Sequence, residues 1–510
     1  FTGTDGSSLI SALTLDMSAA GAATFNSTIN GFGLKTFGTH SFLISEDGAT
    51  GTIDDAQYNV GFGVNVFEAL TSGDQNTGIG GFAFEALTTG SNNTAVGLNG
   101  LRALTTGTNN TTVGSLSLRT NTTGSTNTAV GYAALNANTT ASNNTAIGSE
   151  ALTANTTGAD NTAVGMNSLK ANTTASFNTA MGKNSMEANT TGANNTAYGR
   201  ESLASNTTAS NNTAIGYNSL LVNTTGASNT AVGSGALDAN TTASENTAMG
   251  HNSLSANTTG AENTAIGQNA LLTNTTGSFN VSVGKSSLAS NTTASENTAV
   301  GKNALGSNTT GGLNTGIGAT ALSSNTTGQY NTAVGGQALQ ANTTASNNTA
   351  VGLNAMLTNT TGTRNTAMGA FALDACTTGS NNTAIGDNAL STQTTGGSCV
   401  AIGRAALNAS NSSANVAVGY HSSLNLTTGD SCVTMGFESG EDITTGSHNT
   451  LIGFRAGMNI TTSNYNTIMG SNAASNQTTA SQNTCYGYGS GSSIVDGSNN
   501  LMFGFNANVS

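Results

Sequence analysis

Apolar and polar residues recur along this chain with a period of 17 residues. The repeating unit reads N-T-A-V-G-x-x-A-L-x-A-N-T-T-G-x-x, and its first Asn stands at Asn93, Asn110 and onward at the same spacing. The register runs from Asn59 to Asn500 and contains 27 starts, and one unit, beginning at Cys399, is a residue short. A fixed period over most of a chain predicts stacked structural repeats rather than conventional globular domains.

Positions in the unit are numbered 1 to 17 from this first Asn. Position 5 is Gly in all 27 units, as at Gly97, Gly131 and Gly165. Such a rule requires either a positive φ or stacked backbones that leave no room for a Cβ. Gly and Asn at fixed sites, together with β-branched Thr and Val, oppose helix and favour short strands. The sequence therefore predicts an all-β fold, a parallel β-solenoid or β-roll of 17-residue coils with two or three short strands each.

Two positions of the unit carry large apolar side chains. Position 4 is always apolar, as at Val130 and Ile147, and position 9 is Leu, Met or Phe from Phe67 to Leu407. Because side chains alternate along a strand, we expect positions 2 and 4 to face inward and Ala at position 3 to face outward. A second short strand would turn Leu135 and Leu152 inward.

Position 12 is expected to face the interior as well. Near the C-terminus, position 9 becomes Gly440, and position 12 of the same unit changes from Asn to Ile443. An apolar group lost at one site thus reappears at the other. Asn at position 12, as at Asn138 and Asn155, would then form a ladder of amides that are hydrogen-bonded from coil to coil.

Small residues fill the two positions expected to face outward. Position 3 is small up to Thr434, and position 8 is nearly always Ala or Ser. Such stripes favour close approach of another chain, which predicts a trimer of parallel rods with Ala231, Ala248 and Ala265 between chains. Small residues could instead serve only to avoid crowding between coils about 4.8 Å apart. Position 3 becomes larger from Leu451 onward, which predicts a change in trimer packing near residue 440.

The repeat divides the chain into three parts. Residues 1–58 lack it and are expected to form an N-terminal β-rich cap or connector, with short strands between Leu13 and Ile29. Residues 59–439 form the regular repeat, and residues 440–510 hold variant repeats.

Composition limits the function classes. Only 7% of the residues are charged and the net charge is −13, which disfavours nucleic acids and anionic membrane surfaces as partners. No apolar run is long enough to insert into and cross a bilayer. The four cysteines are scattered and are expected to be free, packed thiols.

No residues form a recognisable catalytic, cofactor or metal site. His40, His251, His421 and His448 are isolated, without a second ligand at metal spacing. No Ser-His-Asp order or nucleophile elbow occurs, and most carboxylates fall at variable turn positions rather than in the pairs that glycan hydrolysis needs. We therefore expect a structural protein rather than an enzyme.

The 17-residue units resemble repeats in the tail fibres of bacteriophages, especially marine phages. The N-T-A-V-G core is also similar to the N-S-V-A-I-G motif in the heads of trimeric autotransporter adhesins, which are parallel β-rolls with somewhat shorter coils. The N-T-T-G segment departs from that motif. The first resemblance implies a viral tail fibre shaft that mediates host attachment, located in the virion. The second implies a cellular trimeric adhesin or extracellular surface filament. Either would be a homotrimer that engages a host cell-surface receptor or glycan.

Overall fold

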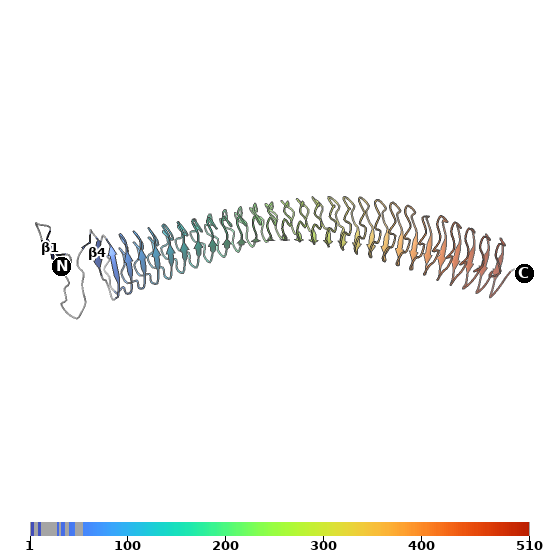
Figure 1. The fold of residues 1–510 in the computed structure, drawn as a ribbon, viewed down its shortest axis with the longest axis horizontal. Coiled ribbons are helices and arrows are strands. Elements are labelled where there is room, and N and C mark those ends of the chain that lie inside the picture. Colours follow the sequence, from blue (N-terminus) through green and yellow to red (C-terminus); the bar gives the residue numbers. More distant parts are fainter. Residues whose placement is uncertain are drawn as a thin grey trace. The chain divides into compact units, whose positions relative to one another are not determined.

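In a computed structural model, the chain is all-β over the residues described, which are 2–4, 9–11, 28–29, 32–35, 40–45 and 55–508. Residues 55–508 hold 27 strands, one for each coil, and Figure 1 shows them as parallel arrows within each of two compact units, residues 1–235 and 236–510. Each strand occupies positions 2 to 4 of the repeat. These strands are β6 (Val60–Phe62), β7 (Thr77–Ile79), β8 (Thr94–Val96), β9 (Thr111–Val113), β10 (Thr128–Val130), β11 (Thr145–Ile147), β12 (Thr162–Val164), β13 (Thr179–Met181), β14 (Thr196–Tyr198), β15 (Thr213–Ile215), β16 (Thr230–Val232), β17 (Thr247–Met249), β18 (Thr264–Ile266), β19 (Val281–Val283), β20 (Thr298–Val300), β21 (Thr315–Ile317), β22 (Thr332–Val334), β23 (Thr349–Val351), β24 (Thr366–Met368), β25 (Thr383–Ile385), β26 (Val400–Ile402), β27 (Val416–Val418), β28 (Val433–Met435), β29 (Thr450–Ile452), β30 (Thr467–Met469), β31 (Thr484–Tyr486) and β32 (Leu501–Phe503).

Neighbouring coils pair in parallel and in register. Strand β10 pairs with β11 so that Thr128 lies opposite Thr145 and Val130 opposite Ile147, one repeat apart. The predicted parallel β-solenoid of 17-residue coils is confirmed. The chain divides into two compact units, residues 1–235 and 236–510, and the same pairing recurs within each.

Each coil holds one strand instead of the expected two or three. After the strand, the chain passes through a run of turns in which positions 7 and 9 adopt left-handed backbone conformations, as at Ala133 (φ 54°) and Leu135 (φ 52°). Leu135 is nevertheless fully buried, so the predicted inward direction of position 9 is correct although no second strand carries it. Left-handed backbone is unusual for a bulky residue, and a pattern of apolar positions does not reveal it.

The inward and outward faces of the strand are the reverse of those predicted. Ala at position 3 is buried throughout, whereas positions 2 and 4 lie at the surface. Ile147 is 41% exposed and Val130 is partly exposed, so both belong to the outer face of the sheet and not to the core. The interior is thin, and the Leu at position 9 from the opposite wall leaves room only for a small residue at position 3.

The volumes at positions 3 and 9 complement each other in the first coils. Position 9 is Phe at Phe67 and Phe84, whose rings stack with centroids 5.5 Å apart. Position 3 of the same coils is Gly61 and Gly78. A Cβ added at Gly61 would lie 3.1 Å from the Phe67 ring. Position 3 is therefore small because it forms the second half of the core.

The predicted interchain residues Ala231, Ala248 and Ala265 are corrected on the same grounds. All three are completely buried within their own chain. They face the interior of the solenoid and cannot lie between chains. Position 8 is likewise buried, as at Ala134 and Ser168.

The change near residue 440 takes place inside the core and not at a surface. It begins one coil earlier, where position 9 is Ser423 and position 12 is a buried Leu426. Position 9 then becomes Gly440 and Gly457, while Leu451 and Ile468 at position 3 are fully buried. Ile443 at position 12 is also buried, and its Cδ1 lies 2.8 Å from where a Cβ on Gly440 would be. The larger residues at position 3 thus fill space that Leu vacates. The pairing of β28 with β29 continues in register through this region.

Shorter strands precede the first coil. They are β1 (Thr2–Thr4), β2 (Leu9–Ser11), β3 (Thr28–Ile29), β4 (Phe32–Lys35) and β5 (Phe42–Ser45). Strand β5 pairs antiparallel with β4 and parallel with β6, and Leu43 is buried. Most of the segment from Leu13 to Ile29 lies outside the described residues, so the cap or connector expected for residues 1–58 stays a prediction.

Candidate functional site: the outer face of the sheet

The Gly column at position 5 has both of the causes expected from the sequence. Gly131 has a φ of 132°, in the region that L-residues with a Cβ avoid. A Cβ on Gly131 would also lie 2.5 Å from the carbonyl oxygen of Gly148 in the next coil. The same two features hold for Gly97 and Gly165. This column turns the chain sharply at the end of each strand.

The predicted Asn ladder at position 12 is present. Asn138 donates from Nδ2 to Oδ1 of Asn121 at 2.9 Å, and Asn155 donates to Asn138 at the same distance. Asn155 Nδ2 also donates to the Gly158 carbonyl oxygen at 2.9 Å, within its own coil. These amides are completely buried, so each hydrogen bond offsets the cost of removing a polar group from water.

A second buried Asn ladder runs along position 1 and was not predicted. Asn93 donates to Asn76 Oδ1 from both its backbone N, at 3.0 Å, and its Nδ2, at 3.1 Å. Its Nδ2 also donates to the carbonyl oxygen of Gly107 at 2.9 Å. The signal was visible in the sequence, because position 1 is Asn in every unit except those at Cys399 and Cys432.

All four cysteines are free and buried, as expected. Cys399 and Cys432 take the place of Asn at position 1, Cys376 takes its place at position 12, and Cys485 lies at position 3. Burial raises the pKa of the Cys376 and Cys485 thiols to about 11. Thiols that stay protonated at neutral pH are poor nucleophiles and poor metal ligands, so these cysteines serve as packing residues.

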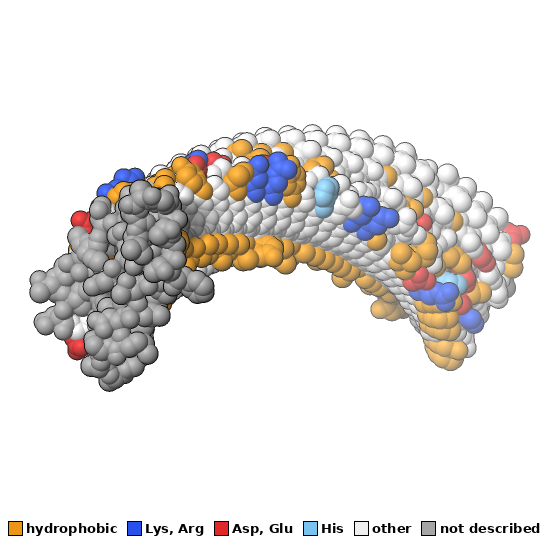
Figure 2. Space-filling model, turned by 60° about the vertical axis from the view of Figure 1, so that its left-hand side comes forward, with side chains coloured by type: hydrophobic (Ala, Val, Ile, Leu, Met, Phe, Trp, Pro, Cys, Tyr) orange, Lys and Arg blue, Asp and Glu red, His pale blue; other side chains and the backbone are white. Residues whose placement is uncertain are grey.

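The outer face of the sheet is an unbroken apolar column with Thr beside it. Position 4 is Val, Ile, Met, Phe or Tyr in every coil, and position 2 is Thr, Val or Leu. Tyr198 at position 4 is 56% exposed, and Met368 is 44% exposed. In Figure 2, hydrophobic side chains (orange) gather in a stripe along successive coils.

Exposed apolar residues gather on this side of the coil. The exposed large hydrophobic residues from Tyr58 to Phe505 lie at positions 17, 2, 4 and 6, and the exceptions are Val222, Phe371 and Val495. Positions 17 and 6 flank the strand on either side. Contiguous apolar patches of more than a few hundred Å² are uncommon on monomeric proteins and mark interaction surfaces. The outer face is therefore the candidate functional site.

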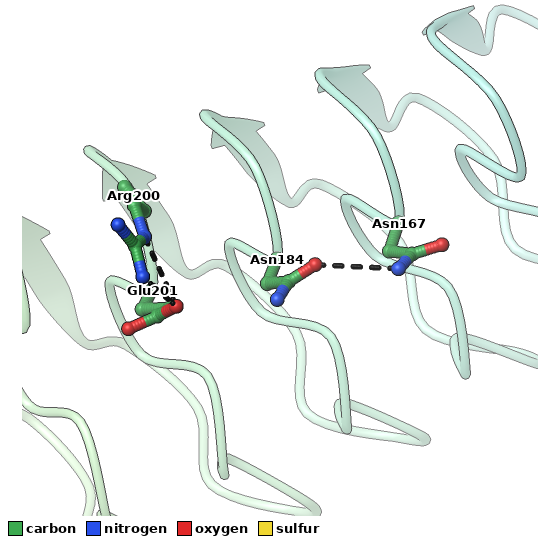
Figure 3. Close-up of polar contacts among 4 residues, drawn as sticks. All are labelled: Asn167, Asn184, Arg200 and Glu201. Carbon is green, nitrogen blue, oxygen red and sulfur yellow. Dashed lines mark hydrogen bonds and ion pairs between the residues drawn. The ribbon is translucent and has the colours of Figure 1, made fainter.

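Charged residues do not enter this face. None of the Lys, Arg, Asp and Glu residues from 59 onward stands at positions 1 to 5 of a coil. One charged residue next to the face makes a local pair. Arg200 at position 6 binds Glu201 at 2.9 Å, and in the two preceding coils Asn167 donates to Asn184 at 3.3 Å (Figure 3).

The coils between residues 420 and 455 carry an aromatic row at position 6. Tyr420 stacks on Phe437, and Phe437 stacks on Phe454, with ring centroids 5.1 and 5.4 Å apart. Because the rings lie on top of one another, they expose mainly their edges. Glu441 lies nearby, with its Oε1 3.4 Å from Nδ1 of His421. The pKa of Glu441 is raised, mainly by burial and secondly by the negative charge of Glu438.

Within the described part of the chain, no group of three His, Cys, Asp or Glu residues could hold a metal ion. The same residues contain no helix that is both long and apolar enough to pass through a membrane. A comparison of the chain with models of known protein families and with curated proteins finds no match.

Proposed function

We propose that this chain is the shaft of a viral tail fibre, a non-catalytic homotrimer that holds a receptor-binding tip away from its base. The tip would meet a host cell-surface receptor or glycan. The fold, a long parallel β-solenoid, is compatible with such a structural fibre. The alternative, favoured by the N-T-A-V-G core, is a cellular adhesin or surface filament.

The observation that carries the proposal is the continuity of coil-to-coil bonding. Besides the strand ladder, Asn columns at positions 1 and 12 and a Thr column at position 13 link successive coils over long runs within each unit. In that Thr column, the hydroxyl of Thr139 donates to the carbonyl oxygen of Thr156 at 3.1 Å. Identical bonds repeated along one axis resist bending and shear, which is what a shaft requires.

The test is the location of the protein on its native particle. Antibodies against the full chain, viewed by immunogold electron microscopy, should label slender appendages of viral particles. The gene should lie among tail and baseplate genes. Label on a cell envelope, with secretion genes as neighbours, would contradict the viral role and support the adhesin or filament.

A further inference from the structure

The outer face of unit 236–510 has the chemistry of a buried interface but lies at the surface of the single chain. Its position-4 side chains run from Met249 to Phe503 without a polar residue. Met249, Ile266 and Ile317 are each exposed by about two fifths. Thr at position 2 adds a row of methyl and hydroxyl groups. Ala at position 3 completes the interior, so the core does not require an apolar residue at position 4.

The two flanks of this face carry opposite charge in the first coils of the unit. On the position-6 flank, the only charged residues before residue 380 are Lys285 and Lys302. On the position-17 flank, Glu245, Glu262 and Glu296 precede Arg364, which is the single Lys or Arg residue of that flank. All of these side chains are exposed. The face therefore has a basic side and an acidic side.

These charges are not neutralised along their own columns. Lys285 and Lys302 occupy adjacent coils, as do Glu245 and Glu262, so like charges stand one above the other. Directly opposed like charges destabilise a sheet. None of these side chains forms an ion pair with another residue that the structure describes.

We propose that this face is the surface through which copies of the chain associate side by side, parallel and in register. The inference rests on the proposed fibre and specifies its interface. In a cyclic assembly about an axis along the solenoid, the position-6 flank of each copy meets the position-17 flank of the next, and same-numbered residues lie at one height. Lys302 then faces Glu296 of the neighbouring copy, because the two residues flank the same strand, β20, and so lie at one height. An antiparallel pair about a perpendicular twofold axis would instead place lysines beside lysines.

With its flanks included, the face approaches the area of a stable interface. Full burial of one Val, Ile or Met side chain removes roughly 60–120 Å² of apolar area from water. The two fifths of Met249, Ile266 or Ile317 that stay exposed therefore correspond to roughly 20–50 Å² each. The 16 strands of this unit, β17 to β32, therefore offer on the order of 500 Å² from position 4 alone. Exposed Phe279, Tyr330 and Leu353 on the flanks extend it. A standard stable interface buries about 800 Å² per partner.

Cross-linking of single-cysteine variants tests both the surface and the polarity. Ile266→Cys and Met435→Cys lie at position 4, ten coils apart. In a parallel, in-register assembly each residue lies opposite its own copies, so a short bifunctional maleimide should cross-link both variants between chains. The control is Thr327→Cys at position 14, an exposed site on another face. The wild-type chain, whose four cysteines are buried, gives the background. Cross-linking of only one variant, or of neither above the control, would overturn the proposal.

Charge reversal provides the second test. Lys285→Glu with Lys302→Glu should raise the dissociation constant at least ~10-fold at low salt, because acidic flanks then meet. Adding Glu262→Lys and Glu296→Lys should restore association to within about threefold. If Glu262→Lys and Glu296→Lys do not restore association, the position-6 flank of one copy does not face the position-17 flank of the next.

The two proposals can fail separately. A chain that labels viral appendages but does not cross-link refutes the interface and leaves the fibre role. A chain that cross-links as predicted but labels another structure refutes the fibre role and leaves the interface.

Discussion

The coil that begins at Asn263 and the coil that begins at Cys432 enclose the same thin core with different residues. The first uses Ala265 and Leu271, whereas the second uses Thr434 and Gly440. Both pairs are at positions 3 and 9, and the second coil adds a buried Ile443 where the first has Asn. The comparison shows that interior volume is exchanged among three columns. Position 4 takes no part in this exchange. It stays apolar in both coils, although it lies outside the core.

The largest expected effect is the difference in stability between Arg substitutions at two neighbouring residues of a regular coil. Ala265→Arg places an unpaired charge in the core, which costs about 3–5 kcal/mol and should unfold the surrounding coils locally. Ile266→Arg places the same charge on the outer face and should cost the fold less than about 1 kcal/mol. Limited proteolysis and thermal melting followed by circular dichroism measure the difference. Equal effects of the two substitutions would contradict the assigned faces.

The variant coils give the next largest effect. Gly440→Leu should destabilise by about 1–3 kcal/mol, because its Cβ would lie 2.8 Å from Ile443 Cδ1 and from Leu451 Cδ1. Adding Ile443→Asn and Leu451→Ala, which recreates the regular arrangement, should recover most of that loss. Additive losses in the triple variant, measured by thermal melting, would show that the three columns do not share one volume.

The interrupted Asn ladder predicts a gain in stability. Asn359 Oδ1 is buried without a hydrogen-bond partner, because the next coil has Cys376 at position 12. Cys376→Asn should supply the missing donor and stabilise the chain by about 1 kcal/mol. Cys376→Ala, which supplies no donor, is the control. A loss of stability in the Asn variant would mean that the thiol packs better than an amide there.

The last effect is a pH dependence, which is absent near neutral pH. Burial raises the pKa of Cys485 from about 9 to about 11, so the folded chain keeps this proton longer than the unfolded chain. The thiol's contribution to stability is therefore constant below pH 9 and is lost progressively as the pH rises to 11. Cys485→Ala introduces Ala, the usual residue of position 3, and should lack this pH-dependent loss of stability. The melting temperatures of the two proteins, compared across that range, measure it, and parallel curves would contradict it.

Sequence alone predicted the features that have a single physical cause. Gly at position 5 and the Asn ladder at Asn138 and Asn155 follow from backbone geometry and from amide hydrogen bonding. The facing of the strand could not be settled by alternation, because Thr, Ala and Val offer an apolar side in either direction. The deciding clue was the pairing of Gly61 with Phe67, in which a larger position 9 accompanies a smaller position 3. The left-handed backbone of Leu135 could not be predicted from the sequence. A Leu side chain that points into the core is equally consistent with a strand at this position.

The central claim is that the outer apolar face, and not the Ala column, joins copies of the chain. Light scattering of the purified full chain tests it most directly, with Ile266→Lys, Ile317→Lys and Met368→Lys combined in one variant. Thr276→Lys, Thr327→Lys and Thr378→Lys, exposed at position 14 of the same coils, form the matched control. We predict an oligomeric mass for the wild type and the control, and a monomeric mass with unchanged circular dichroism for the first variant. A monomeric wild type, or a first variant that keeps the oligomeric mass, would contradict the claim.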